Sequence, residues 1–168
     1  MSVSMYQASI SVFVRGLDNL AAILRKAAAH AHAKDIMPAF FLNAQLAPDM
    51  FALVRQVQIV SDTAKGCAAR LAGVEVPSFA DTESSFPELQ ARIARTITFL
   101  QSITAQQLDG SEARPITLKV HDKEIHFTGQ DYLLGFAIPN FYFHLTTAYG
   151  ILRHNGVDIG KADYLGSL

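Results

Sequence analysis

Residues 10–24 read Ile10-Ser-Val-Phe-Val-Arg-Gly-Leu-Asp-Asn-Leu-Ala-Ala-Ile-Leu24, and their apolar pattern decides the fold that we expect. The apolar residues recur in steps of three, four, three and four, at Ile10, Phe13, Leu17, Leu20 and Leu24. This spacing places them on one stripe of an α-helix that packs against other helices. Ala-rich sequence extends the helix over about residues 4–33, and the segment from Asp35 to Pro38 ends it.

Two further segments repeat this spacing. A second helix is predicted to open near Pro48 and to stop at Gly73. Its apolar stripe is Met50, Leu53, Val57, Val60, Ala64, Cys67 and Leu71. A third helix is predicted to begin at Ser85-Phe-Pro-Glu88, which matches the capping box in which serine and glutamate satisfy each other's free backbone donors. Its stripe is Leu89, Ile93, Ile97 and Leu100.

A fourth helix is predicted from Thr128 to about His154, with Gly156 as its stop. It carries two neighbouring stripes, Leu134, Ile138, Phe141, Leu145, Ala148 and Leu152 in one and Leu133, Ala137, Asn140, His144, Thr147 and Ile151 in the other. A helix that is apolar over so much of its circumference is either the most buried helix or faces a second subunit, and we expect both. Pro139 removes a hydrogen bond to Gly135 and predicts a kink just before Asn140.

Residues 116–127 change from helical to alternating periodicity and predict a β-hairpin between the third and fourth helices. If Val120 pairs with Ile125 across Asp122-Lys123, one face carries Leu118, Val120, Ile125 and Phe127. The other face then carries Thr117, Lys119, His126 and Thr128. The turn type stays open, because Asp-Lys is not a preferred turn pair.

The length of the connection between the second and third helices predicts the topology. A helix of about 25 residues is about 37 Å long, and the 11 residues from Val74 to Ser84 reach at most about 40 Å. That is enough to return the chain along the whole helix, whereas antiparallel neighbours need only about two to eight residues. We therefore expect an all-α, four-helix up-down-down-up bundle, formed by residues 1–168 as a single domain.

Composition narrows the class of protein. Half of the 168 residues are hydrophobic and 17% are charged, which favours a large core over disorder. The net charge of -1 and the lack of a Lys/Arg run argue against nucleic acid as a partner. No stretch approaches the roughly 20 apolar residues of a membrane span, and no secretory signal is seen, so we expect a cytoplasmic protein. The single cysteine, Cys67, is expected to be a buried thiol.

His144 is the histidine with the clearest potential for chemistry, because it lies beside the main apolar stripe. Asn140 lies one turn earlier on the same face. Buried polar groups need partners, so one interpretation is a core histidine bonded to another helix. The other is that Asn140 and His144 line a small-molecule pocket between helices, completed by Gln56 or Arg55, the latter suited to an anionic ligand. Motifs for phosphate loops, zinc hydrolases, serine hydrolases and di-iron bundles are missing from the sequence.

Several segments carry a resemblance to a known family. They are Leu46-Ala-Pro-Asp-Met-Phe51, Arg55-Gln-Val-Gln58, Arg70-Leu-Ala-Gly73, Pro139-Asn-Phe-Tyr-Phe-His144 and Thr147-Ala-Tyr-Gly-Ile-Leu-Arg-His-Asn-Gly-Val157. Over almost its whole length the chain resembles an uncharacterised bacterial family of unknown function in the DinB/YfiT-like superfamily. The resemblance implies a four-helix bundle with the crossover described above, and often a homodimer.

The same resemblance implies a metal site. The superfamily includes metal-dependent transferases that act on small thiols and hold a divalent metal, such as Zn or Ni, with three histidines. The second histidine of the last helix corresponds to His144. The other two correspond to Asn140 and to a position near Gln56, where this chain has amides instead. The resemblance therefore implies a degenerate metal site with His144 as its remaining histidine ligand.

Three functions stay open from the sequence. The first is a small-molecule-binding protein that uses Arg55, Gln56, Asn140 and His144. The second is a metal-dependent thiol-type transferase in which a metal or His144 activates a thiol or water. The third is a dimeric, non-catalytic helical protein whose buried polar residues only fix the packing. Whether the chain is an enzyme is not decided by its sequence.

Overall fold

The computed structural model describes residues 3–120 and 122–167 and is mostly helical, with one small antiparallel hairpin. The long helical elements are α1 (Val12–Ala33), which follows the π-helical turn η1 (Gln7–Ser11), α3 (Leu53–Ala72), α4 (Phe86–Ser102) and α7 (Ile138–His154). Shorter elements are α2 (Pro38–Leu42), α5 (Ala105–Leu108), η2 (Ser111–Ala113), α6 (Gly129–Tyr132), η3 (Leu133–Ala137) and α8 (Lys161–Leu165). The strands are β1 (Pro115–Val120) and β2 (Lys123–Thr128).

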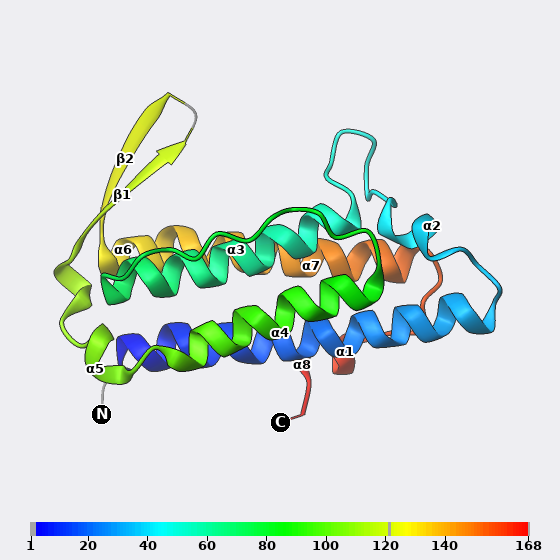
Figure 1. Cartoon of the computed structure of the whole chain (residues 1–168), viewed down its shortest axis with the longest axis horizontal. Helices are drawn as coiled ribbons and strands as arrows, with labels where there is room; N and C mark the ends of the chain where they lie inside the picture. Colours follow the sequence, from blue (N-terminus) through cyan, green and yellow to red (C-terminus); the bar gives the residue numbers. More distant parts are fainter. Residues whose placement is uncertain (1–2, 121, 168) are drawn as a thin grey trace.

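The long helices lie side by side, as Figure 1 shows. Helix α3 packs on α7 and α4, and α1 packs on α4 and α7. In this view α1 and α7 run in one direction, whereas α3 and α4 run in the other, so the segment 73–85 crosses the length of the molecule between them. No helix in the described ranges is long and apolar enough to cross a membrane.

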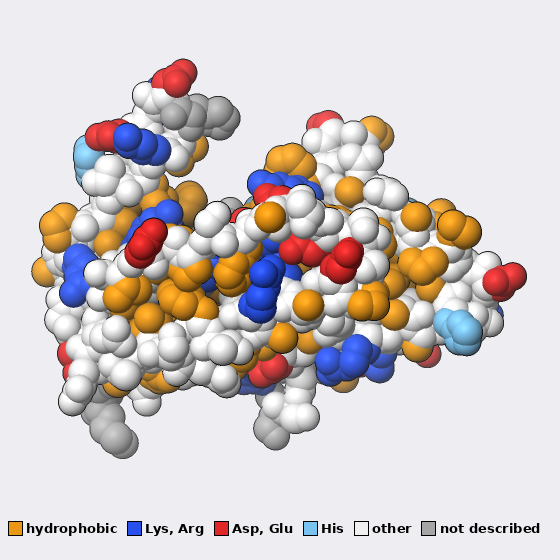
Figure 2. Space-filling model, in the orientation of Figure 1, with side chains coloured by type: hydrophobic (Ala, Val, Ile, Leu, Met, Phe, Trp, Pro, Cys, Tyr) orange, Lys and Arg blue, Asp and Glu red, His pale blue; other side chains and the backbone are white. Residues whose placement is uncertain are grey.

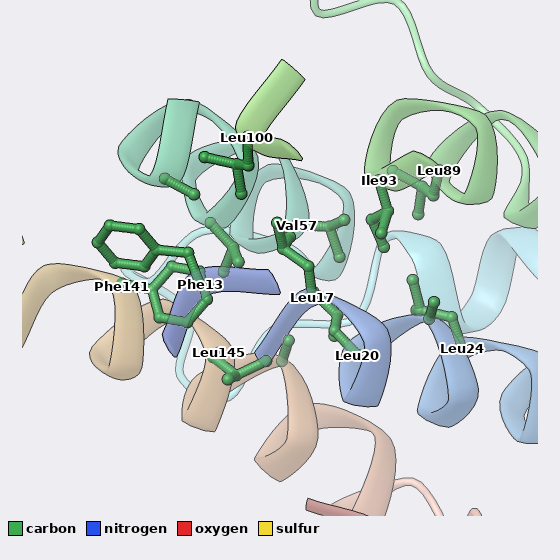
Figure 3. Close-up of a cluster of buried hydrophobic side chains, with 14 of the residues drawn as sticks. Phe13, Leu17, Leu20, Leu24, Val57, Leu89, Ile93, Leu100, Phe141 and Leu145 are labelled. Carbon is green, nitrogen blue, oxygen red and sulfur yellow. The ribbon is translucent and has the colours of Figure 1, made fainter. Parts of the chain in front are cut away.

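A single cluster of hydrophobic side chains fills the space between the helices. Figure 3 shows how α1, α3, α4 and α7 each contribute to it. The predicted stripe of α1 is buried along its whole length, at Ile10, Phe13, Leu17, Leu20 and Leu24. Phe13 and Phe141 meet with their ring centroids 4.9 Å apart. Helical periodicity thus correctly identified the inward faces of these helices.

The predicted ends of α3 and α4 are partly confirmed. Gly73 ends α3 with a φ of +70°, the left-handed conformation that glycine adopts without a steric penalty. The Ser85 hydroxyl accepts from the Glu88 backbone N–H at the start of α4, as expected. The Glu88 carboxylate, however, accepts from the backbone N–H and the hydroxyl of Ser84, where the capping box predicts the N–H of Ser85. Ser85 is thus the N-cap residue, and Ser84 supplies the second half of the cap.

The predicted start of the second helix is wrong. Helix α3 begins at Leu53, not near Pro48, and the short helix α2 was not predicted. The Leu53 N–H donates to the Ala44 carbonyl, 3.0 Å away, which closes residues 44–53 into a loop before the helix begins. A proline suits a first helical turn, but here Pro48 belongs to that loop.

The last long helix contains a π-helical turn that shifts its buried face. Helix α6, η3 and α7 follow one another without a break, and η3 ends just before Pro139. A π-helical turn places one extra residue in the helix and turns the preceding part of the helix relative to the part that follows. Leu134, predicted to lie on the buried stripe, is therefore 53% exposed, whereas Leu133 and Ala137 are fully buried. The simple period of 3.6 residues failed at this one turn.

The hairpin is present, but its predicted register is wrong. Val120 pairs with Lys123 and Leu118 pairs with Ile125, so the loop is two residues shorter than expected. Because the shift is an even number of residues, the predicted faces are kept. On the polar face, Thr117 is 3.0 Å from the Nδ1 atom of His126.

A charged network, which we call the crossover clasp, holds the segment 73–85 against α3 and α4. Its centre is the fully buried Arg92 of α4, whose guanidinium contacts Asp62 at 2.8 Å, Asp81 at 3.0 Å and Glu83 at 3.0 Å. Lys65 adds a contact of 2.7 Å to Asp62. Burial disfavours the ionised form of the Glu83 carboxyl group. Hydrogen bonds from Gln58 and Arg92 outweigh this effect of burial and lower the pKa of Glu83. Figure 2 shows basic and acidic side chains close together near the middle of the face that it presents.

We predict that Arg92→Met destabilises the fold by about 3 kcal/mol, because it leaves carboxylates around a buried position without their cation. Urea unfolding followed by circular dichroism measures this loss. Arg95→Met is the matched control, since Arg95 is exposed and stacks on Phe79 from outside, and its loss is expected to cost less than about 1 kcal/mol. Equal effects of the two substitutions would contradict the central role of Arg92.

Candidate functional site

His144 and Gln56 meet across the interface between α7 and α3. The Nδ1 atom of His144 lies 2.7 Å from the Oε1 atom of Gln56. Both side chains are buried, with 9% of His144 and 1% of Gln56 exposed. Two residues that are 88 positions apart in the sequence are thus brought into direct contact by helix packing. These two are predicted site residues whose side chains bond directly to each other.

The Gln56 amide is held from its other end by the loop before α3. Its Nε2 atom donates to the Phe51 carbonyl at 2.9 Å. The loop itself is fixed by Gln45, which donates to the Met50 carbonyl, and by the Leu53–Ala44 hydrogen bond. Gln56 is therefore clamped between a backbone carbonyl and an imidazole.

Asn140 does not join this pair. Its Nδ2 atom donates to the Thr63 hydroxyl on α3 at 2.8 Å. Asn140–Thr63 and His144–Gln56 are thus two separate polar pairs along the same interface between α3 and α7. The sequence pattern placed Asn140 and His144 on one helical face, but each has its own partner on α3.

Arg55 lies beside the pair, but its charge is already matched. Its Nη1 atom is 2.5 Å from an Asp81 carboxylate oxygen and 3.3 Å from the Oε1 atom of Gln58. Its guanidinium also stands over the Phe51 ring, 5.9 Å from the centroid. Arg55 therefore joins the site to the crossover clasp.

An apolar depression is lined by Phe143, the residue that precedes His144 in α7. The Phe143 ring stands edge-on to the imidazole, with the centroids 5.1 Å apart, and 57% of Phe143 is exposed. The depression has a volume of about 640 Å³ and runs over the outer face of α7. Its lining is Leu46, Tyr142, Phe143, Thr146, Thr147, Tyr149 and Gly150.

Phe51, in the loop that holds Gln56, is as exposed as Phe143. Phe51, Phe143 and Leu46 were not predicted as part of the site. The available signal was that Phe143 adjoins His144 in the sequence.

The electrostatic surroundings keep His144 neutral. Burial disfavours the imidazolium, and the positive charge of Arg55 acts in the same direction. Both effects hold the pKa of His144 below its ordinary value of 6.5. At pH 7 the side chain is therefore an uncharged imidazole.

The residues present do not fit a divalent transition metal. Gln56 Oε1 is bonded to His144, Asn140 is bonded to Thr63, and amides are weak ligands for zinc or nickel. Within residues 3–120 and 122–167, no three His, Cys, Asp or Glu side chains are placed to hold a metal ion. The geometry favours hydrogen bonding at His144 rather than metal coordination.

Cys67 offers no second reactive centre. The thiol is fully buried in α3, as predicted, and burial raises its pKa, which Arg70 opposes only in part. Arg70 instead donates to the Tyr132 hydroxyl at 3.1 Å, and burial raises the pKa of Tyr132 to about 12. Both groups stay protonated at neutral pH and pack in the hydrophobic core.

Comparison with known proteins identifies the family. A crystal structure described as a DinB family member protein from Shewanella denitrificans matches with a TM-score of 0.89 and 43% identity. The match covers 98% of this chain and 93% of that one. The fold is thus that of a DinB-like helical protein.

Residues 5–165 match the family model DUF1993, a domain of unknown function, and the chain belongs to that family. No curated protein is significantly similar to it.

We predict that His144 titrates below pH 6.5 in the folded protein. The folded state binds this proton more weakly than the unfolded chain, so the contribution of His144 to stability falls as the pH drops from about 6.5 towards the folded pKa. Arg55→Met should raise the pKa only in part, because burial is the larger cause. NMR titration of the imidazole carbon-bound protons measures both values. A midpoint at or above 6.5 in the wild-type protein would show that the site does not disfavour the charged form.

Proposed function

We propose that this protein binds a small molecule at the outer end of the His144–Gln56 pair, between α3 and α7. The observation that carries the proposal is the 2.7 Å contact between His144 and Gln56. This contact occupies the Nδ1 atom of the imidazole and leaves the Nε2 atom available to a ligand. The exposed ring of Phe143 and the apolar depression beside it supply surface for the body of a ligand. A few polar groups beside apolar walls are typical of ligand sites.

We further propose that this site descends from a metal site whose ligands have been replaced by amides. His144 stands where the resemblance places a metal ligand, whereas Gln56 and Asn140 now make hydrogen bonds within the protein. A metal-dependent transferase that acts on thiols is the alternative enzyme function. The engaged amides favour the binding protein over this alternative.

The remaining parts of the proposal concern architecture. We propose that residues 1–168 form one domain with the four-helix, up-down-down-up arrangement of the DinB/YfiT-like class, that the protein is cytoplasmic, and that it forms a homodimer. A non-catalytic dimer is the second candidate function, and the exposed Leu134 and Phe143 of the last helical segment favour it, since exposed apolar residues gather at interfaces.

Metal analysis and thermal unfolding of the purified protein separate these functions. We expect no stoichiometric Zn or Ni and a ligand-induced rise in Tm. A ligand at about 100 times its Kd would raise Tm by about 5 to 10 °C. His144→Ala should abolish that rise, whereas the matched control Asn140→Ala should keep it.

Two other outcomes would contradict the binding function. Stoichiometric metal that is lost in a folded His144→Ala variant would favour the transferase. A protein that binds neither metal nor any small molecule, and whose Tm collapses on His144→Ala, would favour the non-catalytic dimer.

A further inference from the structure

The orientation of the Gln56 amide follows from its backbone partner. The Phe51 carbonyl can only accept a hydrogen bond, so the amide nitrogen of Gln56 has to face it, at 2.9 Å. The amide oxygen, Oε1, is thereby turned towards His144. A loop carbonyl thus decides which end of the glutamine meets the imidazole.

The same reasoning fixes the proton on His144. An amide oxygen carries no hydrogen, so a 2.7 Å contact with the Nδ1 atom requires Nδ1 to be the donor. A neutral imidazole with its proton on Nδ1 has a free lone pair on Nε2. The hydrogen bonds that link the Phe51 carbonyl to the Gln56 amide, and the Gln56 amide to the His144 imidazole, therefore select one of the two neutral tautomers.

The Nε2 atom is left for an external partner. Within the part of the chain that the structure describes, it makes no hydrogen bond. Two side-chain polar atoms in this part are both buried and without a partner, Arg92 Nε and Ser111 Oγ. Because the Nε2 atom of His144 has no partner and is not one of these two, it is accessible to solvent. It belongs to the ring that Phe143 contacts at the edge of the apolar depression.

We infer that Gln56 is a positioning residue that presents Nε2 of His144 as a hydrogen-bond acceptor, and that the ligand is a small neutral molecule with an O–H or N–H donor on an apolar body. This inference rests on the proposed function. The apolar body matches Phe143, Phe51 and Leu46, all of which are exposed. An anionic ligand fits less well, because Arg55 is paired with Asp81.

Long-range ¹H–¹⁵N NMR at alkaline pH tests the tautomer directly. We expect the wild-type protein to carry the His144 proton on Nδ1. Gln56→Met removes the acceptor and should shift the population towards the Nε2–H form. Gln56→Glu restores an acceptor and should recover the Nδ1–H form. Asn140→Leu is the matched control, because it removes the neighbouring polar pair without touching Gln56, and it should leave the tautomer unchanged.

Two probes that share a phenyl ring and its oxygen test the class of ligand. Phenol offers an O–H donor, whereas anisole carries a methyl group in place of the hydroxyl proton. We expect phenol to bind about tenfold more tightly than anisole, since anisole would leave Nε2 without a partner. The measurement is the shift of the Phe143 backbone amide resonance on titration, which both proteins have, and His144→Ala should remove the difference between the two probes.

The outcomes distinguish the inference from the proposed function. A wild-type protein with its proton on Nε2 overturns the inference and leaves the proposed site standing. The expected tautomer with equal affinity for the two probes overturns the class of ligand. The expected tautomer with no response to either probe overturns the class of ligand as well, and counts against the binding function itself.

Discussion

Helices α3 and α4 run in the same direction, and the rest of the structure depends on this constraint (Figure 1). The connection between them has to run back along both helices in extended form, so its backbone N–H and C=O groups lack the internal hydrogen bonds of a helix and need other partners. The crossover clasp meets part of this requirement, because the buried guanidinium of Arg92 donates to the Ala80 carbonyl and also binds the carboxylates of Asp81 and Glu83 in that segment. It also contacts Asp62 on α3, so one side chain joins both helices to the connection between them.

The candidate site depends on the same arrangement. Arg55, next to Gln56 in α3, bonds to Asp81 of the crossover, while Gln56 reaches the loop before the helix and His144 on α7. The position of the imidazole is thus determined by three segments that are distant in sequence. Burial and the nearby cation both favour its neutral form, which is the form that accepts a hydrogen bond.

Sequence periodicity predicted the helices and their buried faces because burial repeats every 3.6 residues. It missed the late start of α3, because the Ala44–Leu53 hydrogen bond that closes the loop is invisible in a pattern of apolar residues. It misplaced Leu134, because a π-helical turn has no apolar signature. His144 and Gln56 were found as polar residues near an apolar stripe, but their pairing, and that of Asn140 with Thr63, depends on the relative position of two helices.

The π-helical turn η3 sets how the part of the helix before it is oriented relative to the part after it. The portion after it carries His144. The rings of Tyr132, just before the turn, and of Phe136, within it, contact the ring of Phe127 in the β-hairpin. Deleting one residue from this turn would rotate the earlier portion by about 100° relative to the later one. The hairpin would then project in another direction while the imidazole stayed in place. Leu133 and Ala137 would turn out of the core at the same time, so the extra residue of the π-helical turn sets both the direction of the hairpin and the packing of the helix beneath it.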